Sequence, residues 1–213
     1  MKIILVESKN DKAFYTYLIK RIFCCKALVE EIEAKQTCKI QEMSGKDNLR
    51  LKLEEIKERY KAKEEDTDGK LIVGVIIDRD DDEIEHRKQD IEKTFDSVFA
   101  DMPTDAKLIS YIFDDNYKEI EYYLKAKKNK DSTFADCIFN SCRDGISEKD
   151  LMKEWVRLYL KNACDKKTKK SNNEDCLFQR VFECERAADF FDFKVEDLPR
   201  FKIFLNYITE NKD

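Results

Sequence analysis

Short apolar runs punctuate the first half of the chain. Residues 2–6 (KIILV) and 71–77 (LIVGVII) are unbroken and rich in β-branched side chains, which is typical of buried strands. Residues 37–43 (TCKIQEM) alternate apolar and polar positions, and residues 108–113 (LISYIF) form another largely apolar run. These patterns predict four strands in the first 113 residues.

Amphipathic segments fill the intervals between these runs. Apolar side chains recur at helical spacing over residues 14–25, 49–60 and 84–99. Strands that alternate with helices in this way form parallel sheets covered on both faces. The sequence therefore predicts an α/β fold with a mostly parallel, roughly four-stranded sheet in three layers.

The pattern changes after residue 114, where no further strand is indicated. A polar, lysine-rich linker occupies residues 165–175. We expect an α/β core over residues 1–128 and a helical C-terminal part over residues 129–213 that packs on this core. The helices expected beyond residue 114 lie near residues 117–128, 133–142, 148–164, 175–188 and 197–210.

Composition narrows the chemistry that this chain can perform. With 4 glycines and 2 prolines it lacks the turn-formers of a sandwich or barrel, and it lacks a glycine-rich phosphate loop. His86 is the single histidine, which excludes a multi-histidine zinc site and argues against a Ser-His-Asp triad. Charged residues make up 41% of the chain, so carboxylates and lysines are the candidates for chemistry.

Net charge and targeting signals bear on the binding partners and the cellular compartment of the protein. The net charge of −5 is not that of a protein that binds nucleic acid over its whole surface, although a local basic patch remains compatible with it. The longest apolar run is too short for a membrane span, and the opening residues turn charged too soon for a secretory signal. We therefore expect no membrane association and a cytoplasmic protein whose 8 cysteines stay reduced.

Acidic side chains follow two of the predicted strands directly. Glu7 comes after residues 2–6, and Asp78 comes after residues 71–77, with Asp80 two positions further on. Carboxyl ends of parallel strands meet at one edge of a sheet, where functional crevices lie. Carboxylate oxygens are the ligands that Mg²⁺ and Mn²⁺ prefer. A metal site at this edge is one interpretation of the pattern.

Helix capping is the alternative interpretation of the same acids. Acidic residues favour the first turn of a helix, so the run that starts at Asp78 can simply open the helix over residues 84–99. Asp11 stands three residues after Ser8, which is the spacing of a capping-box partner. The sequence leaves both interpretations open.

Three segments resemble the TOPRIM domain. Residues 4–15 (ILVESKNDKAFY) resemble its first motif, in which a strand ends in glutamate, and residues 73–82 (VGVIIDRDDD) resemble its DxD strand. Residues 111–124 (YIFDDNYKEIEYYL) are similar to a segment of the OLD-type (overcoming-lysogenization-defect) nucleases. The resemblance covers roughly residues 1–125, includes TOPRIM-like proteins of unknown function, and implies a TOPRIM/Rossmann-like sheet.

This resemblance implies roles for five acids. Glu7 corresponds to the TOPRIM glutamate, a general acid/base or metal ligand, and Asp78 and Asp80 correspond to the Mg²⁺ ligands. Asp11 and Glu121 match acids of the nuclease-type variants that serve a second metal. The implied activity is that of a Mg²⁺- or Mn²⁺-dependent phosphotransferase or hydrolase, in particular a nuclease. A non-catalytic module that binds metal, nucleotide or protein is the alternative.

One position departs from the TOPRIM pattern, and one segment suggests a partner surface. Ser8 stands where the family usually has glycine, which puts close approach of a phosphate in doubt. Lys125, Lys127 and Lys128 follow two tyrosines and form a candidate nucleic-acid-binding patch, or the basic end of an amphipathic helix. The OLD resemblance also implies a separate ATPase as a partner, and a homo-oligomer is the alternative.

Overall fold

The computed structural model packs as two units. The first unit combines Met1–Lys118 with Val195–Asp213, and the second unit is Glu119–Lys194. Within these bounds the structure describes residues 1–24, 28, 30, 32, 38–62, 70–79, 83–102, 106–113, 117, 119–141, 145–163, 175–183 and 186–210.

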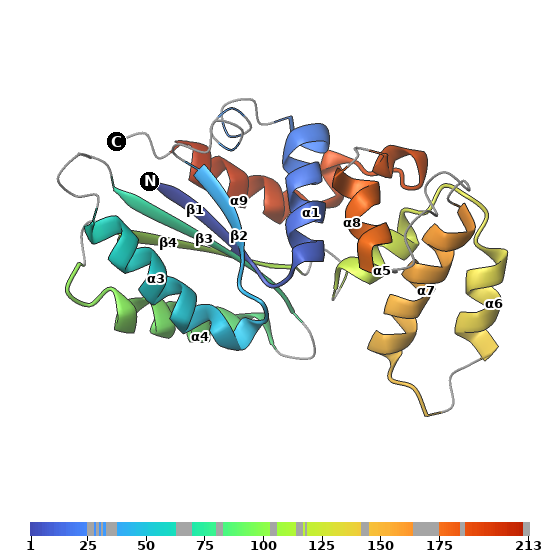
Figure 1. Ribbon diagram of the computed structural model, residues 1–213, viewed down its shortest axis with the longest axis horizontal. Coiled ribbons are helices and arrows are strands. Elements are labelled where there is room, and N and C mark those ends of the chain that lie inside the picture. The colour runs from blue at the N-terminus through green and yellow to red at the C-terminus, as the bar shows by residue number, and fades with distance from the viewer. Residues whose placement is uncertain are drawn as a thin grey trace. The chain divides into compact units, whose positions relative to one another are not determined.

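The first unit is built on a parallel sheet, which confirms the α/β fold predicted from the apolar runs (Figure 1). Its strands are β1 (Lys2–Val6), β2 (Cys38–Glu42), β3 (Leu71–Asp78) and β4 (Ala106–Phe113). They lie in the order β2-β1-β3-β4, and every neighbouring pair is parallel. The longest apolar run of the sequence is therefore a central strand, whereas β4 lies at an edge.

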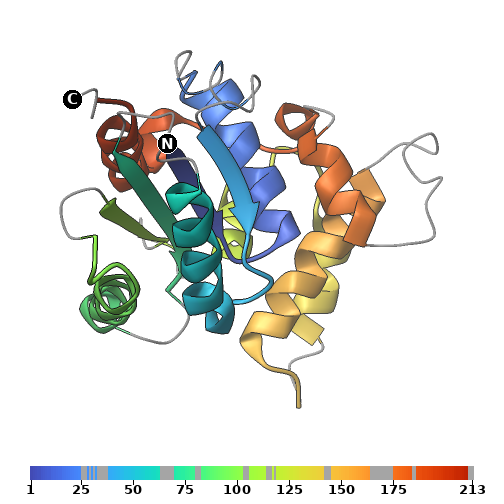
Figure 2. The same ribbon diagram turned by 60° about the vertical axis from the view of Figure 1, so that its left-hand side comes forward.

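Helices cover both faces of this sheet and give it three layers. One face carries α1 (Lys9–Tyr17), which continues as a π-helical turn over Leu18–Ile22, and α9 (Pro199–Glu210). The other face carries α3 (Leu49–Lys61) and α4 (Ile84–Val98). Figures 1 and 2 show α3 and α4 together on the side of the sheet opposite α1 and α9.

The core under α3 and α4 follows from the two side-chain periodicities. Alternate residues of β3 point toward these helices. Apolar residues three or four positions apart on the helices pack against them. Each helix buries one stripe and exposes its charged positions to water. The buried residues from these three elements include Leu53, Ile56, Val73, Val75, Ile91 and Phe95.

The opposite face of the sheet is closed by aromatic side chains and by one glycine. Phe201 of α9 packs against Tyr15 of α1 and Tyr111 of β4, with ring centroids 5.4 and 5.1 Å apart. Gly74 of β3 lies directly under α9, where a Cβ atom would stand 2.9 Å from the side chains of Phe204 and Ile208. Gly74 therefore allows α9 to approach the sheet closely.

The second unit is helical. Its helices are α5 (Ile120–Ala126), α6 (Thr133–Ser141), α7 (Glu148–Ala163) and α8 (Asp175–Glu183), so the helical character predicted beyond residue 114 is confirmed. Hydrogen-bonded backbone also joins two stretches far apart in sequence, through a single antiparallel bridge between Lys128 and Phe191. No helix in the described part of the chain is both long and apolar enough to cross a membrane.

The division into units differs from the boundary drawn on sequence. The helical part was expected over residues 129–213, but α9 belongs with the sheet because it buries Phe201, Phe204 and Ile208 against that unit. Residues 119–128, expected in the core, belong with the helical unit. Helical periodicity reveals that a segment has an apolar face, but it does not reveal which neighbour that face covers.

Candidate functional site

Glu7 and Asp78 lie together at the carboxyl edge of the sheet. The register of β1 and β3 pairs Val6 with Ile76, so both strands end at nearly the same level. The Oε1 atom of Glu7 accepts a hydrogen bond of 3.0 Å from the backbone N–H of Asp78, in a partly buried position. The two acids that follow the apolar runs are thus neighbours in space.

The loop after β2 holds the main chain of Glu7. The backbone N–H of Gly45 donates a 2.9 Å hydrogen bond to the carbonyl of Glu7, and the N–H of Met43 donates to the carbonyl of Val6 at 2.8 Å. Ser44 and Gly45 both have positive φ, +60° and +108°, which turns the chain sharply. Glu7 is therefore fixed by its carbonyl on one side and by its carboxylate on the other.

Asp11 forms the capping box that its spacing from Ser8 indicates. The Ser8 side chain accepts from the backbone N–H of Asp11 at 3.2 Å, and Oδ2 of Asp11 accepts from the N–H of Ser8 at 2.8 Å. The interpretation of Asp11 as a helix-capping residue is thus confirmed. A role for Asp11 as a second metal ligand remains a prediction, with one carboxylate oxygen already engaged at the start of α1.

Tyr15 adds a polar group that the sequence reasoning missed. Its side chain is 1% exposed, and its hydroxyl has no hydrogen-bond partner among the described residues. Burial raises the pKa of Tyr15 well above its ordinary value, and the charge of nearby Asp78 acts in the same direction. The phenol therefore stays protonated and keeps an O–H to donate.

The surroundings of Tyr15 connect it to the carboxyl edge. After burial and Asp78, the groups that raise its pKa are Tyr111, Asp11 and Glu7. The available sequence signal was the spacing of Asp11 and Tyr15, which stand four residues apart and so share one face of α1. An unpartnered buried hydroxyl near three carboxylates is costly to folding, and so it points to a role in binding.

The described residues do not by themselves complete a metal site. Within the described ranges, no group of three or more His, Cys, Asp or Glu side chains is arranged to hold a metal ion. Asp80 lies outside the described residues, as do Asp81 and Asp82. Glu7 and Asp78 are neighbouring acids at this edge, and the metal site expected from the sequence remains a prediction.

Glu121 lies in the second unit, in the first turn of α5. Burial raises its pKa, the nearby charge of Glu119 raises it further, and Lys153 and Lys149 act in the opposite direction. Glu119 is itself buried, with its Oε1 3.2 Å from the ammonium of Lys149. Glu121 is thus a desolvated carboxylate of the helical unit, and its part in a second metal site remains a prediction.

The three lysines of the predicted nucleic-acid patch make contacts inside the helical unit. The Lys125 ammonium lies 3.3 Å from the ring centroid of Phe139, and the Lys127 ammonium lies 6.0 Å from that of Tyr123. Lys128 forms a 2.9 Å ion pair with Asp136. These contacts favour the interpretation as the basic end of an amphipathic helix.

Asp136 connects that ion pair to the core of the unit. Its Oδ2 also accepts a 2.6 Å hydrogen bond from Ser132, and its Oδ1 accepts one of 2.8 Å from the indole N–H of Trp155. Burial works against ionisation of this carboxyl group. Hydrogen bonds from Lys128, Ser132 and Trp155 outweigh that effect and lower its pKa to about 2. The network joins α6 and α7 to the segment that follows α5.

Comparison with known proteins places the chain in one family. The model of a family described as "Protein of unknown function (DUF3226)" matches residues 1–175. The match includes the whole sheet and most of the helical unit, and it ends before α9. Neither the curated proteins nor the solved structures give a match.

Proposed function

The chain belongs to the DUF3226 family, whose function is unknown, and we propose that it is a Mg²⁺- or Mn²⁺-dependent hydrolase of phosphodiesters, in particular a nuclease. The unpartnered hydroxyl of Tyr15 carries this proposal. It is buried near Glu7, Asp11 and Asp78, where a bound ligand would give it the acceptor that the described residues do not provide.

The position of the acids supports the same function. Parallel α/β sheets bind their ligands beyond the carboxyl ends of the strands, and Glu7 and Asp78 occupy two adjacent ends. Acids that lie side by side at such an edge are the arrangement that binds a cation in many sites of this kind. Carboxylate oxygens are the ligands that a hard divalent cation prefers, so one cation could bind both acids.

Each acid then has a role in the proposed reaction. Asp78 and Asp80 would hold the metal ion together with Glu7, and Glu7 would also position or deprotonate the attacking group. The TOPRIM resemblance implies a second-metal role for Asp11 and for Glu121, and we retain each role as a proposal. A bound Mg²⁺ supplies charge that stabilises the phosphoryl oxygens in the transition state. Tyr15 donates its O–H to the bound phosphate or to a water beside it.

The substrate follows from this chemistry only as a class. Nucleic acid or a nucleotide provides the phosphodiester or phosphate that the acids and a metal would bind. The proposed contacts to the phosphate backbone of the nucleic acid remain Lys125, Lys127 and Lys128. Their ammonium groups already make cation–π and ion-pair contacts within the helical unit, which leaves them less available to bind a phosphate. A separate ATPase is a further proposed partner.

We also propose a cytoplasmic location. The cysteines whose side chains are described, Cys24, Cys38 and Cys137, are free thiols. Free thiols of this kind suit a reducing compartment, where glutathione and thioredoxin keep cysteines reduced.

A non-catalytic module that binds metal, nucleotide or protein is the second candidate. Two of the proposed ligands already have structural partners, since Glu7 bonds to the neighbouring strand and Asp11 caps α1. No complete metal-binding group occurs among the described residues, which also favours this alternative. The two candidates share the site and differ in whether the bound phosphate is cleaved.

Paired binding and cleavage measurements distinguish the two candidates. Titration calorimetry with Mn²⁺ reports binding, and labelled single- and double-stranded DNA and RNA with Mg²⁺ or Mn²⁺ report hydrolysis. We expect Asp78→Asn to abolish both, and Glu58→Gln, which changes an exposed carboxylate of α3, to alter neither. Binding without cleavage would establish the module, and unchanged cleavage in Asp78→Asn would remove the proposed site.

A further inference from the structure

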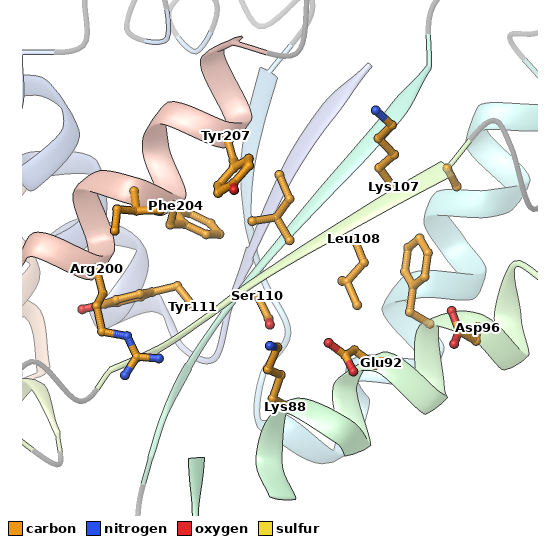
Figure 3. Close-up of a pocket in the computed structure, with 14 residues that line it drawn as sticks. Lys88, Glu92, Asp96, Lys107, Leu108, Ser110, Tyr111, Arg200, Phe204 and Tyr207 are labelled. Atoms are coloured by element: carbon orange, nitrogen blue, oxygen red, sulfur yellow. The ribbon is translucent and has the colours of Figure 1, made fainter. Parts of the chain in front are cut away.

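A groove runs along the outer edge of the sheet. β4 pairs with β3 on one side, and no strand in the described part of the chain pairs with its other side. The groove is lined by β4, α4 and α9 and has a volume of about 810 Å³ (Figure 3). An open strand edge presents backbone N–H and C=O groups that a further strand can bind.

Apolar side chains border this open edge. Ile203 and Tyr207 of α9 are 55% and 59% exposed, and they stand four residues apart on one helical face. Leu108 and Ile109 of β4 are only half-buried. Lys107 is the single charged residue of β4, so the strand from Leu108 to Phe113 lacks the charges that usually protect an edge.

The charges around the groove are separated along its length. Figure 3 shows Lys88 beside Ser110 and Arg200 beside Tyr111, toward the carboxyl end of β4. Glu92 and Asp96 follow on α4, toward the end of β4 at which Lys107 lies. On the α4 side of the rim, one basic group therefore lies toward the carboxyl end of β4 and two acidic groups lie toward its amino end.

We propose that two copies of this chain pair through β4, with the two strands antiparallel. A two-fold axis across the groove brings the carboxyl end of one β4 opposite the amino end of the other. On the α4 side of the sheet, Lys88 of one copy then faces Glu92 and Asp96 of the other, and the same contacts repeat on the opposite side of the axis. Ile203 and Tyr207 of both copies cover the joined strands.

Charge complementarity is the reason for choosing a second copy over another occupant. An extended peptide of a different protein could add a strand to the same edge, but nothing would require its charges to match. The α4 side of this groove is complementary to itself under a two-fold rotation, because Lys88 lies toward one end of β4 and Glu92 and Asp96 lie toward the other. Within the described structure, Lys88, Glu92 and Asp96 are exposed and form no ion pair.

The oligomeric state of the full chain tests this interface. In sedimentation equilibrium over a wide range of concentration, we expect a monomer–dimer equilibrium that Ile203→Glu weakens at least about tenfold, because it buries two charges at the joint. Leu51→Glu is the matched control, since Leu51 of α3 is 54% exposed and lies outside the groove. We expect Leu51→Glu to leave the dissociation constant within about twofold of the wild-type value.

Charge reversal tests the antiparallel arrangement specifically. Lys88→Glu and Asp96→Lys each place like charges opposite one another, so each should weaken the dimer roughly fivefold. The double variant restores opposite charges across the axis, and we expect its dissociation constant to return to within about twofold of the wild-type value. Both side chains are exposed, so circular dichroism should show an unchanged fold.

Several results would overturn the proposal. A chain that remains monomeric at every concentration has no such interface. A dimer that tolerates Ile203→Glu as well as it tolerates Leu51→Glu uses another surface. A dimer whose charge-reversed double variant is weaker than either single variant has a different register or direction. None of these results bears on catalysis at Glu7 and Asp78, so this proposal stands or fails separately from the proposed function.

Discussion

The side chain of Glu7 crosses from β1 to β3, where its Oε1 accepts a 3.0 Å hydrogen bond from the backbone N–H of Asp78. One carboxylate therefore joins two strand ends and also places its charge beside a second acid. The hydrogen bond predicts a contribution of Glu7 to stability, the proposed function predicts one to chemistry, and different substitutions separate the two.

We predict that Glu7→Ala lowers the free energy of unfolding by about 1–3 kcal/mol, because the partly buried N–H of Asp78 loses its acceptor. Glu7→Gln keeps a carbonyl oxygen in the same place and should cost less than about 1 kcal/mol. Urea denaturation measures both values. Glu7→Gln should nevertheless lose metal-dependent cleavage, and equal stability of the two variants would show that the hydrogen bond contributes little.

Tyr15→Phe is expected to keep or raise the stability of the protein while it lowers the proposed activity. The substitution removes a buried hydroxyl without a described partner, so the free energy of unfolding should stay the same or rise by up to about 1 kcal/mol. If the O–H serves a bound phosphate, phosphodiester cleavage should fall roughly tenfold in the same protein. Denaturation and cleavage measured side by side decide this, and unchanged cleavage would leave Tyr15 without a functional role.

Gly74→Ala should destabilise the first unit by about 1–3 kcal/mol, since the new methyl group meets a tightly packed helix. Its Cβ would stand 2.9 Å from Cδ1 of Ile208 and from the Phe204 ring, and both of these side chains are buried. Adding Ile208→Val removes that Cδ1 atom and should recover part of the loss. Thermal denaturation of the single and double variants provides the comparison, and full tolerance of Gly74→Ala would contradict the close packing of α9.

Asp136→Ala should destabilise the helical unit by about 2 kcal/mol, because it leaves Trp155 and Lys128 without their shared partner. The pKa of Asp136 is lowered to about 2, so its contribution is complete above its ordinary value of 3.8 and is lost as the pH falls toward 2. Asp192→Ala, at an exposed ion pair of 3.5 Å, is the control and should cost less than about 0.5 kcal/mol. Denaturation at pH 7 and at pH 3 tests both the size and the sign.

Glu121→Gln should stabilise the protein at neutral pH. Burial raises the pKa of Glu121, so the folded chain holds that proton more tightly than the unfolded chain and the ionised form costs stability. The difference between variant and wild type should shrink as the pH falls toward the ordinary glutamate value of 4.5. Denaturation across this pH range measures it. If Glu121 holds a cation, Mn²⁺ should stabilise the wild type and leave Glu121→Gln unchanged.

The sequence predicted the strands well because their signal is local. The runs over residues 2–6 and 71–77 have few polar interruptions and can only be buried, and the structure confirms both as neighbouring strands. The partner of α9 was not predictable in the same way. Its apolar stripe fits a helical unit and a sheet face equally well, and Gly74, which receives it, lies more than 100 residues earlier.

The candidate site was predictable only in part. Glu7 and Asp78 directly follow two apolar runs that predict strands. The carboxyl ends of parallel strands meet at one edge of a sheet, so the two acids could be predicted to lie close together. Tyr15 gave no comparable signal, because a tyrosine in an apolar helix stripe is usually core. Its distinguishing property is the absence of a partner for its hydroxyl, which depends on every side chain that surrounds it.

The sheet unit is discontinuous along the chain, since its last helix arrives after the whole helical unit has been made. During synthesis on the ribosome, the face of β3 around Gly74 stays uncovered while residues 119–194 emerge and fold. A nascent chain at that stage exposes Tyr15 and Tyr111 to chaperones and proteases. The helix over Pro199–Glu210 is therefore the element that closes this face of the sheet.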